Sequence, residues 1–242
     1  MMIQNFSRIQ KMKTKIVLIL VSFLVITNSF AKVLYDDQVW INTNAFIKLK
    51  EKVSAYIEIQ PRYIEGRDHL GVTLYRSALG YDLNEKTSFW LGYGYIEWSH
   101  PVHFNEHLPF LQFIHHQDFN RLKLTHRGRL EIRNLQDRQS SPMRVRYLLR
   151  GVYDLKTPWN LHAVIYNEWF NHLSGAIEKG SYRAGKVHPG FDQNRLFVGI
   201  GKKFTEKVNL FAELGYMNQF IDTQVKTLKS NHIIASQLTF KF

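Results

Sequence analysis

Arginine and glutamate side chains alternate with apolar ones along several segments of this sequence. Residues 121–133 show the pattern most clearly, because Arg127, Arg129, Glu131 and Arg133 are each two positions apart. Side chains of a β-strand point alternately to its two faces, so these four share one face while leucine and isoleucine side chains share the other. Arginine on one strand can bind a carboxylate on the next strand through paired hydrogen bonds. The pattern therefore predicts a sheet with one ionic face.

The same alternation places further arginine and glutamate residues on this ionic face, and it leaves two interpretations open. The residues could form a structural network that fills and rigidifies a narrow, closed sheet. They could instead form a cationic lining that binds or conducts anions, because arginine outnumbers glutamate by nine to five. The residues concerned are Glu58, Arg62, Arg76, Glu97, Arg127, Arg129, Glu131, Arg133, Arg144, Arg146, Arg150, Glu168, Arg195 and Glu213.

Histidines invite an enzymatic alternative. His100, His103 and His107 surround one expected connection together with Glu106, and histidine can act as a general base or bind a metal. However, no serine occupies a recognisable nucleophile setting, and the adjacent His115 and His116 would point to opposite faces of a regular strand. We therefore predict no catalytic residue, no metal site and no cofactor. A lipid or peptide hydrolase that uses these histidines is the alternative function.

Segments of 10 to 14 residues with alternating polarity recur from Gln38 to the end of the chain. Short connections such as Leu83-Asn84-Glu85-Lys86 alternate with longer ones such as 172–191, which predicts antiparallel neighbours with short turns on one rim and long loops on the other. We count eleven segments, whereas single-chain bacterial barrels have even strand numbers. We therefore expect about 12 strands, within a range of 10–12, the additional strand coming from residues 32–37. The segments are 38–49, 53–63, 71–83, 87–98, 105–117, 121–134, 143–153, 161–171, 192–204, 208–219 and 230–242.

The ionic face must point inward if the apolar face contacts lipid. An arginine on the lipid side of a barrel costs about 2–4 kcal/mol near the bilayer midplane, and Arg127, Arg129 and Arg133 all share the ionic face. No segment after residue 31 has the apolar length of a spanning helix, and a closed barrel pairs every backbone group. The fold class we expect is all-β: a closed, antiparallel transmembrane β-barrel.

The first 31 residues have the organisation of a secretory signal peptide. Four basic residues precede an apolar run at 16–26, and Ser29 and Ala31 stand before an expected cleavage at Lys32. Removing residues 1–31 takes away four of 32 Lys and Arg residues and none of the 20 Asp and Glu residues, which leaves 28 against 20 and a net charge of +8. These charges form no basic block, so we expect no nucleic-acid partner. Residues 32–242 should form a single domain without disulfides, because the chain has no cysteine.

A series of short motifs resembles the domain-of-unknown-function family 2490. Family members are exported, predicted outer-membrane barrels of Gram-negative bacteria without an assigned activity, so the resemblance implies that fold and location and supplies no catalytic residues. The segment after His107 departs from the family pattern, in which an arginine and an aromatic-glutamine run follow, because residues 108–112 (LPFLQ) stand there instead. Pro109 cannot donate to a strand ladder, which leaves the start of that strand open. The motifs are 58–62 (EIQPR), 76–81 (RSALGY), 106–107 (EH), 127–133 (RGRLEIR), 144–147 (RVRY), 166–168 (YNE), 192–195 (DQNR) and 215–219 (GYMNQ).

These observations together predict a non-enzymatic outer-membrane barrel, either structural or a channel for small solutes or anions. Its expected partners are outer-membrane lipids and the barrel-assembly machinery, which recognises a last strand such as the one that ends in Phe242. We expect a monomer. A soluble periplasmic barrel that binds an apolar ligand is a further alternative, but it would need an apolar interior.

Overall fold

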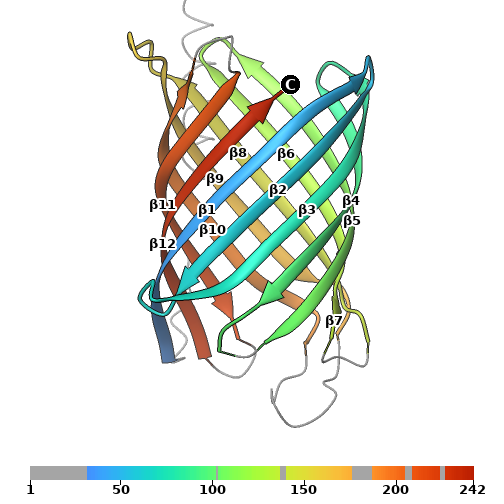
Figure 1. Cartoon of the computed structure of the whole chain (residues 1–242), viewed down its shortest axis with the longest axis vertical. Coiled ribbons are helices and arrows are strands. Elements are labelled where there is room, and N and C mark those ends of the chain that lie inside the picture. The colour runs from blue at the N-terminus through green and yellow to red at the C-terminus, as the bar shows by residue number, and fades with distance from the viewer. Residues whose placement is uncertain (1–31, 102, 137–139, 176–186, 205–208, 224–226) are drawn as a thin grey trace, which may run out of the picture. The chain divides into compact units, whose positions relative to one another are not determined.

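The computed structural model describes residues 32–101, 103–136, 140–175, 187–204, 209–223 and 227–242, and the expected signal peptide lies outside them. Residues 32–242 form one compact unit that is a closed β-barrel (Figure 1). Among the described residues, no helix has the length and apolar character to cross a membrane. The strands are β1 (Lys32–Lys50), β2 (Val53–Ile64), β3 (His69–Asn84), β4 (Thr87–Trp98), β5 (Phe104–Phe119), β6 (Leu122–Ile132), β7 (Asn134–Leu135), β8 (Met143–Asp154), β9 (Leu161–His172), β10 (Gly190–Lys203), β11 (Leu210–Asp222) and β12 (Thr227–Lys241).

Eleven of these strands form the barrel wall, and the two-residue β7 pairs only with β5. Consecutive wall strands are antiparallel, whereas β1 and β12 close the barrel in parallel, with Lys32 opposite Thr227 and Phe46 opposite Lys241. An odd number of alternating strands requires one such parallel pair. The all-β barrel that the sequence predicts is confirmed. The separate strand expected from residues 32–37 is wrong, because these residues are the first part of β1.

The parallel closure places the two ends of the barrel chain on opposite rims. Phe242 lies at the rim of the short turns, where its backbone nitrogen donates to the Phe46 carbonyl, and this rim is uppermost in Figure 1. Lys32 begins β1 at the rim of the long connections, beside the start of β12. The sequence therefore predicts the two kinds of rim correctly, but not the rim at which the barrel begins.

Pro109 lies inside β5 and does not interrupt it. It stands opposite Tyr93 of β4, and on the other side of β5 the pairing with β6 begins at Phe110 while the pairing with β7 involves Glu106 and His107. Pro109 therefore occupies the gap between β6 and β7, where no neighbouring strand needs the N–H group that proline lacks.

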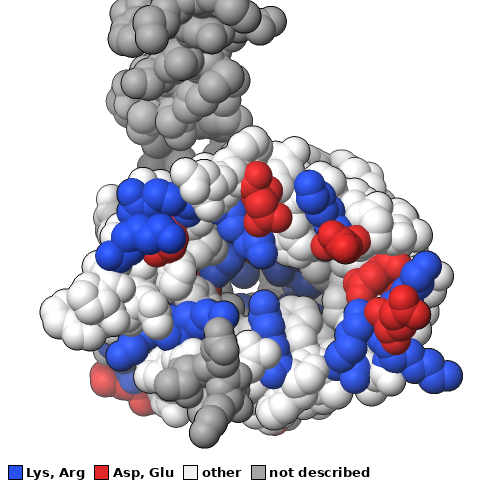
Figure 2. Space-filling model, turned by 90° about the horizontal axis from the view of Figure 1, so that it is seen from above, with Lys and Arg blue, Asp and Glu red and all other residues white. Residues whose placement is uncertain are grey.

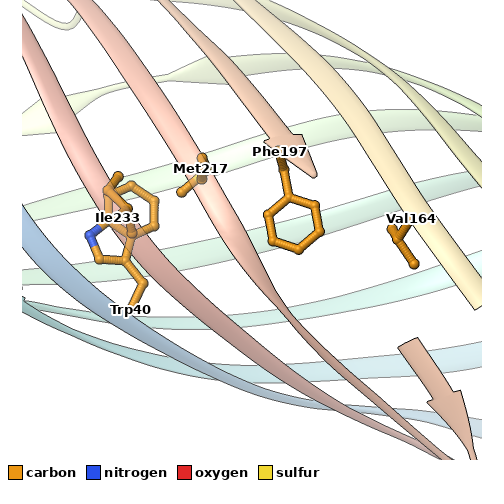
Figure 3. Close-up of a cluster of buried hydrophobic side chains, with 5 residues drawn as sticks. All are labelled: Trp40, Val164, Phe197, Met217 and Ile233. Atoms are coloured by element: carbon orange, nitrogen blue, oxygen red, sulfur yellow. The ribbon is translucent and has the colours of Figure 1, made fainter. Parts of the chain in front are cut away.

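Apolar side chains cover the outside of the wall, whereas the lumen holds polar side chains together with two apolar clusters. Outward residues such as Leu91, Leu79 and Leu214 are 60–64% exposed. One lumenal cluster consists of Trp40, Val164, Phe197, Met217 and Ile233 (Figure 3), and the other of Ala78, Trp90 and Phe110. The Phe110 ring fills the space that a Cβ on Gly92 would occupy, so this strand glycine admits a lumenal aromatic ring.

Candidate functional site

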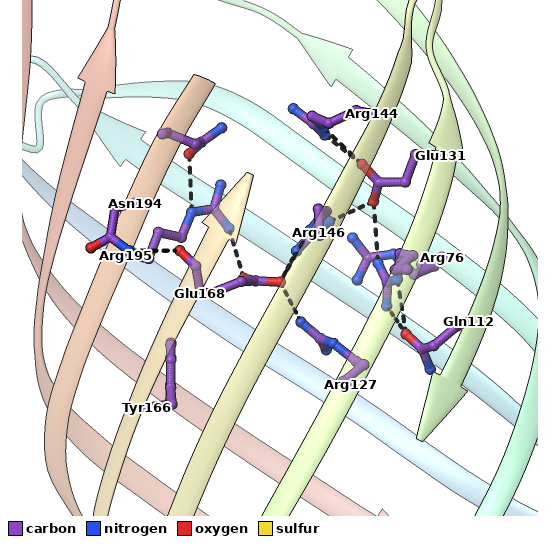
Figure 4. A network of polar contacts seen from close by, with 12 residues as sticks. Arg76, Gln112, Arg127, Glu131, Arg144, Arg146, Tyr166, Glu168, Asn194 and Arg195 are labelled. Carbon is purple, nitrogen blue, oxygen red and sulfur yellow. Dashed lines mark hydrogen bonds and ion pairs between the residues drawn. The ribbon is translucent and has the colours of Figure 1, made fainter. Parts of the chain in front are cut away.

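The centre of the lumen is an ionic network built around Glu131 of β6, which is fully buried. Arg144 donates to its Oε2 from Nε and Nη2 at 2.9 and 2.7 Å, and Arg146 donates to its Oε1 from Nη1 at 2.6 Å (Figure 4). Arg129 Nη1 lies 3.5 Å from the same Oε1. The register explains this meeting, because Glu131 pairs with Arg144 across β6 and β8, and Arg129 pairs with Arg146.

Arg146 connects this carboxylate to a second one, that of Glu168 in β9. Its Nε and Nη2 donate to Glu168 Oε1 at 3.0 and 2.7 Å, and Arg127 Nη2 donates to the same oxygen at 2.6 Å. Arg195 Nη1 lies 3.9 Å from the other carboxylate oxygen. Four strands, β6, β8, β9 and β10, therefore meet in a continuous chain of charges that spans part of the lumen (Figure 4).

Glu106 and Asp192 extend the network toward the long connections. The alternation of polarity did not assign these two carboxylates to the lumen. Glu106 of β5 accepts two hydrogen bonds from Arg133, at 2.6 and 2.9 Å. Asp192 accepts from Arg144 Nη1 at 3.0 Å, and His172 Nε2 lies 3.5 Å from the same carboxylate. Asp192 escaped prediction because the β9–β10 register shifts between Phe191 and Gln193, and such a bulge redirects a side chain that regular alternation would turn outward.

Two further ion pairs lie elsewhere in the lumen. Glu58 accepts from Arg76, from Asn42 Nδ2 at 2.5 Å and from the Tyr56 hydroxyl at 2.8 Å, so both carboxylate oxygens are satisfied. Arg150 pairs with Glu213 across the barrel interior. The first pair joins directly opposite residues of the neighbouring strands β2 and β3, whereas the second joins β8 to β11, which are not neighbours in the sheet. Both agree with a role in holding the wall together.

Aromatic rings pack against the guanidinium groups of several lumenal arginines. The Phe170 ring centre lies 4.3–5.3 Å from the guanidinium carbons of three arginines, Arg144, Arg146 and Arg195. The centre of the Phe110 ring lies 4.3 Å from the guanidinium carbon of Arg129. Cations are attracted to the faces of aromatic rings, more strongly where water is excluded. Phe170 stands two residues after Glu168, so the alternation that identifies the ionic face could also have identified this ring.

Arg62 differs from the other lumenal arginines. Its Nε and Nη2 both donate to Gln60 Oε1, at 3.0 and 2.6 Å, and its guanidinium carbon lies 3.9 Å from the centre of the Trp40 ring. Among the described residues, no carboxylate lies within 4.0 Å of it in an ion pair. Arg195 approaches the same Trp40 ring at 4.9 Å. Within the described part of the chain, the charge of Arg62 therefore has no direct counter-ion.

A cavity of about 1350 Å³ extends along the lumen beside the network. At the rim of the short turns its lining contains five lysines and three acids, namely Lys48, Lys52, Lys86, Lys123 and Lys241 with Glu51, Asp82 and Glu85. Deeper residues of its wall include Arg62 and Arg146. Figure 2, which views this rim from above, shows Lys and Arg together with Asp and Glu around a central hollow. In the interior of the described lumen, away from the rim carboxylates Asp36, Glu51, Asp82 and Glu85, nine arginines face six carboxylates: Arg62, Arg76, Arg127, Arg129, Arg133, Arg144, Arg146, Arg150 and Arg195 against Glu58, Glu106, Glu131, Glu168, Asp192 and Glu213.

Glu97 is the exception among the predicted lumen residues. Its neighbours Ile96 and Trp98 line the cavity, whereas Glu97 does not. It pairs with Thr73 and Asn105 close to the long connections. Because side chains alternate along β4, Glu97 points to the outer face near the end of the strand. Its expected place in the lumen is therefore corrected.

The histidines of the enzymatic alternative do not converge. His107 lies on the outer face, where its Nδ1 bonds to the Tyr93 hydroxyl. His100 contacts Glu65 instead, at 2.9 Å. His115 and His116 bond to Thr87 and Thr125 respectively, on opposite faces of β5. The described residues thus offer no arrangement of a nucleophile, a base and an orienting acid.

The fold and lumen define a closed eleven-stranded β-barrel with an arginine-rich interior. The chain belongs to the family described as "Protein of unknown function (DUF2490)", whose model matches residues 37–229. It is also similar to an uncharacterized protein of Methylorubrum extorquens, at 29% identity over 221 residues that cover 88% of this chain and 90% of that protein. No solved structure matches.

Proposed function

We propose that the protein is a non-enzymatic β-barrel of the outer membrane, exported by residues 1–31 as a signal peptide. The belt of exposed leucine, isoleucine and aromatic side chains around the wall supports this proposal, because a soluble barrel rarely exposes a continuous apolar surface of this extent. Short turns on one rim and longer connections on the other are typical of outer-membrane barrels. Lipids and the assembly machinery, which would recognise β12, remain the proposed partners of a monomer.

Histidines on the outer face give independent support for contact with lipid. Four of them bond to a hydroxyl group on the same face, in the pairs His107–Tyr93, His115–Thr87, His126–Tyr147 and His232–Tyr216. In water an imidazole needs no such partner. In hydrocarbon an unsatisfied polar group costs several kcal/mol, on the order of a lost hydrogen bond or more. Each pair satisfies the Nδ1 atom of its histidine, so pairing of this kind suits a membrane.

We further propose that the lumen admits small anions from the rim of the short turns. The observation that carries this role is the excess of three arginines over carboxylates in the interior of the lumen, nine against six, together with a mouth whose lining contains five lysines and three acids. Low-dielectric walls focus the field of such charges and concentrate anions. The Glu131 and Glu168 clusters narrow the passage and hold its arginines in place.

Ion selectivity in planar bilayers tests this role, with Arg62→Gln as the informative variant. We expect the wild-type protein to conduct with a reversal potential, in a potassium chloride gradient, that favours chloride. Because Arg62 has no carboxylate partner among the described residues, Arg62→Gln removes a charge without leaving an acid unpaired, and we expect severalfold lower anion preference.

The matched control is Lys50→Gln, which removes a positive charge at the exposed end of β1, outside the cavity lining. It should keep the wild-type selectivity. Absence of conductance from the correctly folded wild-type barrel would overturn the anion pathway and leave the network as a structural filling. Equal selectivity of Arg62→Gln and the wild-type protein would also contradict the proposal.

A further inference from the structure

Two histidines and a glutamate meet at the rim of the long connections, outside the lumen. Glu65 follows β2, His69 begins β3, and His100 follows β4. Each offers one ligand atom, and these atoms all lie within 4.8 Å of one another. The imidazoles of His69 and His100 are stacked, with ring centres 4.2 Å apart, and His100 Nε2 lies 2.9 Å from Glu65 Oε2. His69 and Glu65 belong to one hairpin, and His100 belongs to the neighbouring connection.

Backbone contacts hold the two segments together at this point. The Ser99 and His100 nitrogens both donate to the Gly71 carbonyl, at 2.9 and 3.4 Å, which fixes the second segment against the start of β3. His69 pairs with Ile64 in the β2–β3 ladder. The turn that carries Glu65 is held against β1, because the Gly66 nitrogen donates to Asp36 Oδ1 at 3.3 Å. The three side chains are therefore brought together by the wall, and not by a chance contact of free loops.

We propose that Glu65, His69 and His100 bind a divalent transition-metal ion of the zinc class at this rim. Two imidazoles and one carboxylate form a ligand set that suits such ions, and they leave the remaining coordination positions open to water or to a further ligand. Hard ions such as calcium and magnesium prefer an all-oxygen set, which this cluster does not provide.

Binding requires one of the two histidine side chains to reorient. A metal must lie about 2.0–2.1 Å from each histidine nitrogen, in the plane of each ring, so one of the two stacked imidazoles must rotate. Glu65 and His69 are exposed and His100 is partly exposed, so the rotation meets little packing resistance. The ion would then replace the existing contact between His100 and Glu65, and it would join the β2–β3 hairpin to the β4–β5 connection.

Calorimetric titration of the purified, tag-free barrel in detergent with zinc chloride tests the proposal. We expect one zinc ion per chain, at least tenfold weaker binding for His69→Ala and for His100→Ala, and weaker binding for Glu65→Gln. His103→Ala is the matched control: it removes a histidine from the same connection as His100 but from outside the cluster, and it should bind zinc like the wild-type protein.

Cobalt gives a second readout, because its visible absorption reports the ligand set of a bound ion. The wild-type protein should give a cobalt spectrum that zinc abolishes and that His69→Ala lacks. If His69→Ala, His100→Ala and His103→Ala all bind zinc as tightly as the wild-type protein, or if the wild-type protein binds none, the site does not exist. The variants lie outside the lumen, so their result is independent of ion conduction.

Discussion

Replacing Glu131 with glutamine should destabilise the barrel by about 3–5 kcal/mol, the range measured when one partner of a buried ion pair is removed. Glu131 is fully buried and accepts hydrogen bonds from Arg144 and Arg146, with Arg129 at 3.5 Å. Glutamine keeps the size of the side chain but removes its charge, so buried guanidinium groups lose their counter-ion. Urea titration of the detergent-solubilised barrel, followed by tryptophan fluorescence, measures the change in the free energy of unfolding.

Glu85→Gln is the control for this experiment. Glu85 lies exposed in the turn between β3 and β4, where removal of a charge should change stability by less than about 0.5 kcal/mol. A double change of Glu131→Gln with Arg129→Met should recover part of the loss, because it removes a stranded charge whose one ion-pair partner among the described residues is Glu131. If Glu131→Gln and Glu85→Gln unfolded at the same urea concentration, the network would not support the wall.

An arginine in place of Leu91 should prevent or strongly impair assembly of the barrel in a membrane. Leu91 is 64% exposed on the outer face in the middle of β4, and an arginine at the lipid face costs about 2–4 kcal/mol at the bilayer midplane. The outer-membrane yield of Leu91→Arg, compared with that of the wild-type chain, measures the effect. A soluble barrel would gain solubility from the same change.

Leu173→Arg separates the effect of depth from that of charge. Leu173 is 55% exposed, similar to Leu91, but it follows β9 at the rim of the long connections. The cost of a charge falls to about 0–1 kcal/mol near the membrane interface, so Leu173→Arg should assemble nearly as well as the wild-type chain. Equal yields for the two arginine variants would contradict a lipid-facing belt.

Alternation of polarity predicts the strands and the direction of most of their side chains. In a closed barrel whose outside is apolar, the ionic face of each strand must point into the lumen. Alternation correctly places Arg129, Glu131, Arg144 and Arg146 on the same side, and the ladder then pairs them. It also predicts which connections are short. These features depend on local sequence periodicity, which is readable from residue types alone.

Features that depend on register or closure could not be read in this way. The parallel pairing of β1 with β12 joins the two ends of the barrel chain, and no local pattern specifies the direction of such a contact. The bulge at Asp192 turns its side chain into the lumen, whereas regular alternation along β10 would turn it outward. Glu97 was assigned to the lumen by its charge, although its position between Ile96 and Trp98 turns it outward. The meeting of His69 with His100 depends on two connections that are adjacent only in space.

We propose that this closed barrel lies in the outer membrane. Electrophoresis of isolated outer-membrane fractions in dodecyl sulfate, with and without boiling, tests it most directly. We predict that the protein is found in that fraction and that the unboiled sample migrates differently from the boiled one, because a closed sheet has no free edge at which detergent can begin to unfold it. Recovery in the soluble periplasmic fraction, with no change of migration on boiling, would contradict the account.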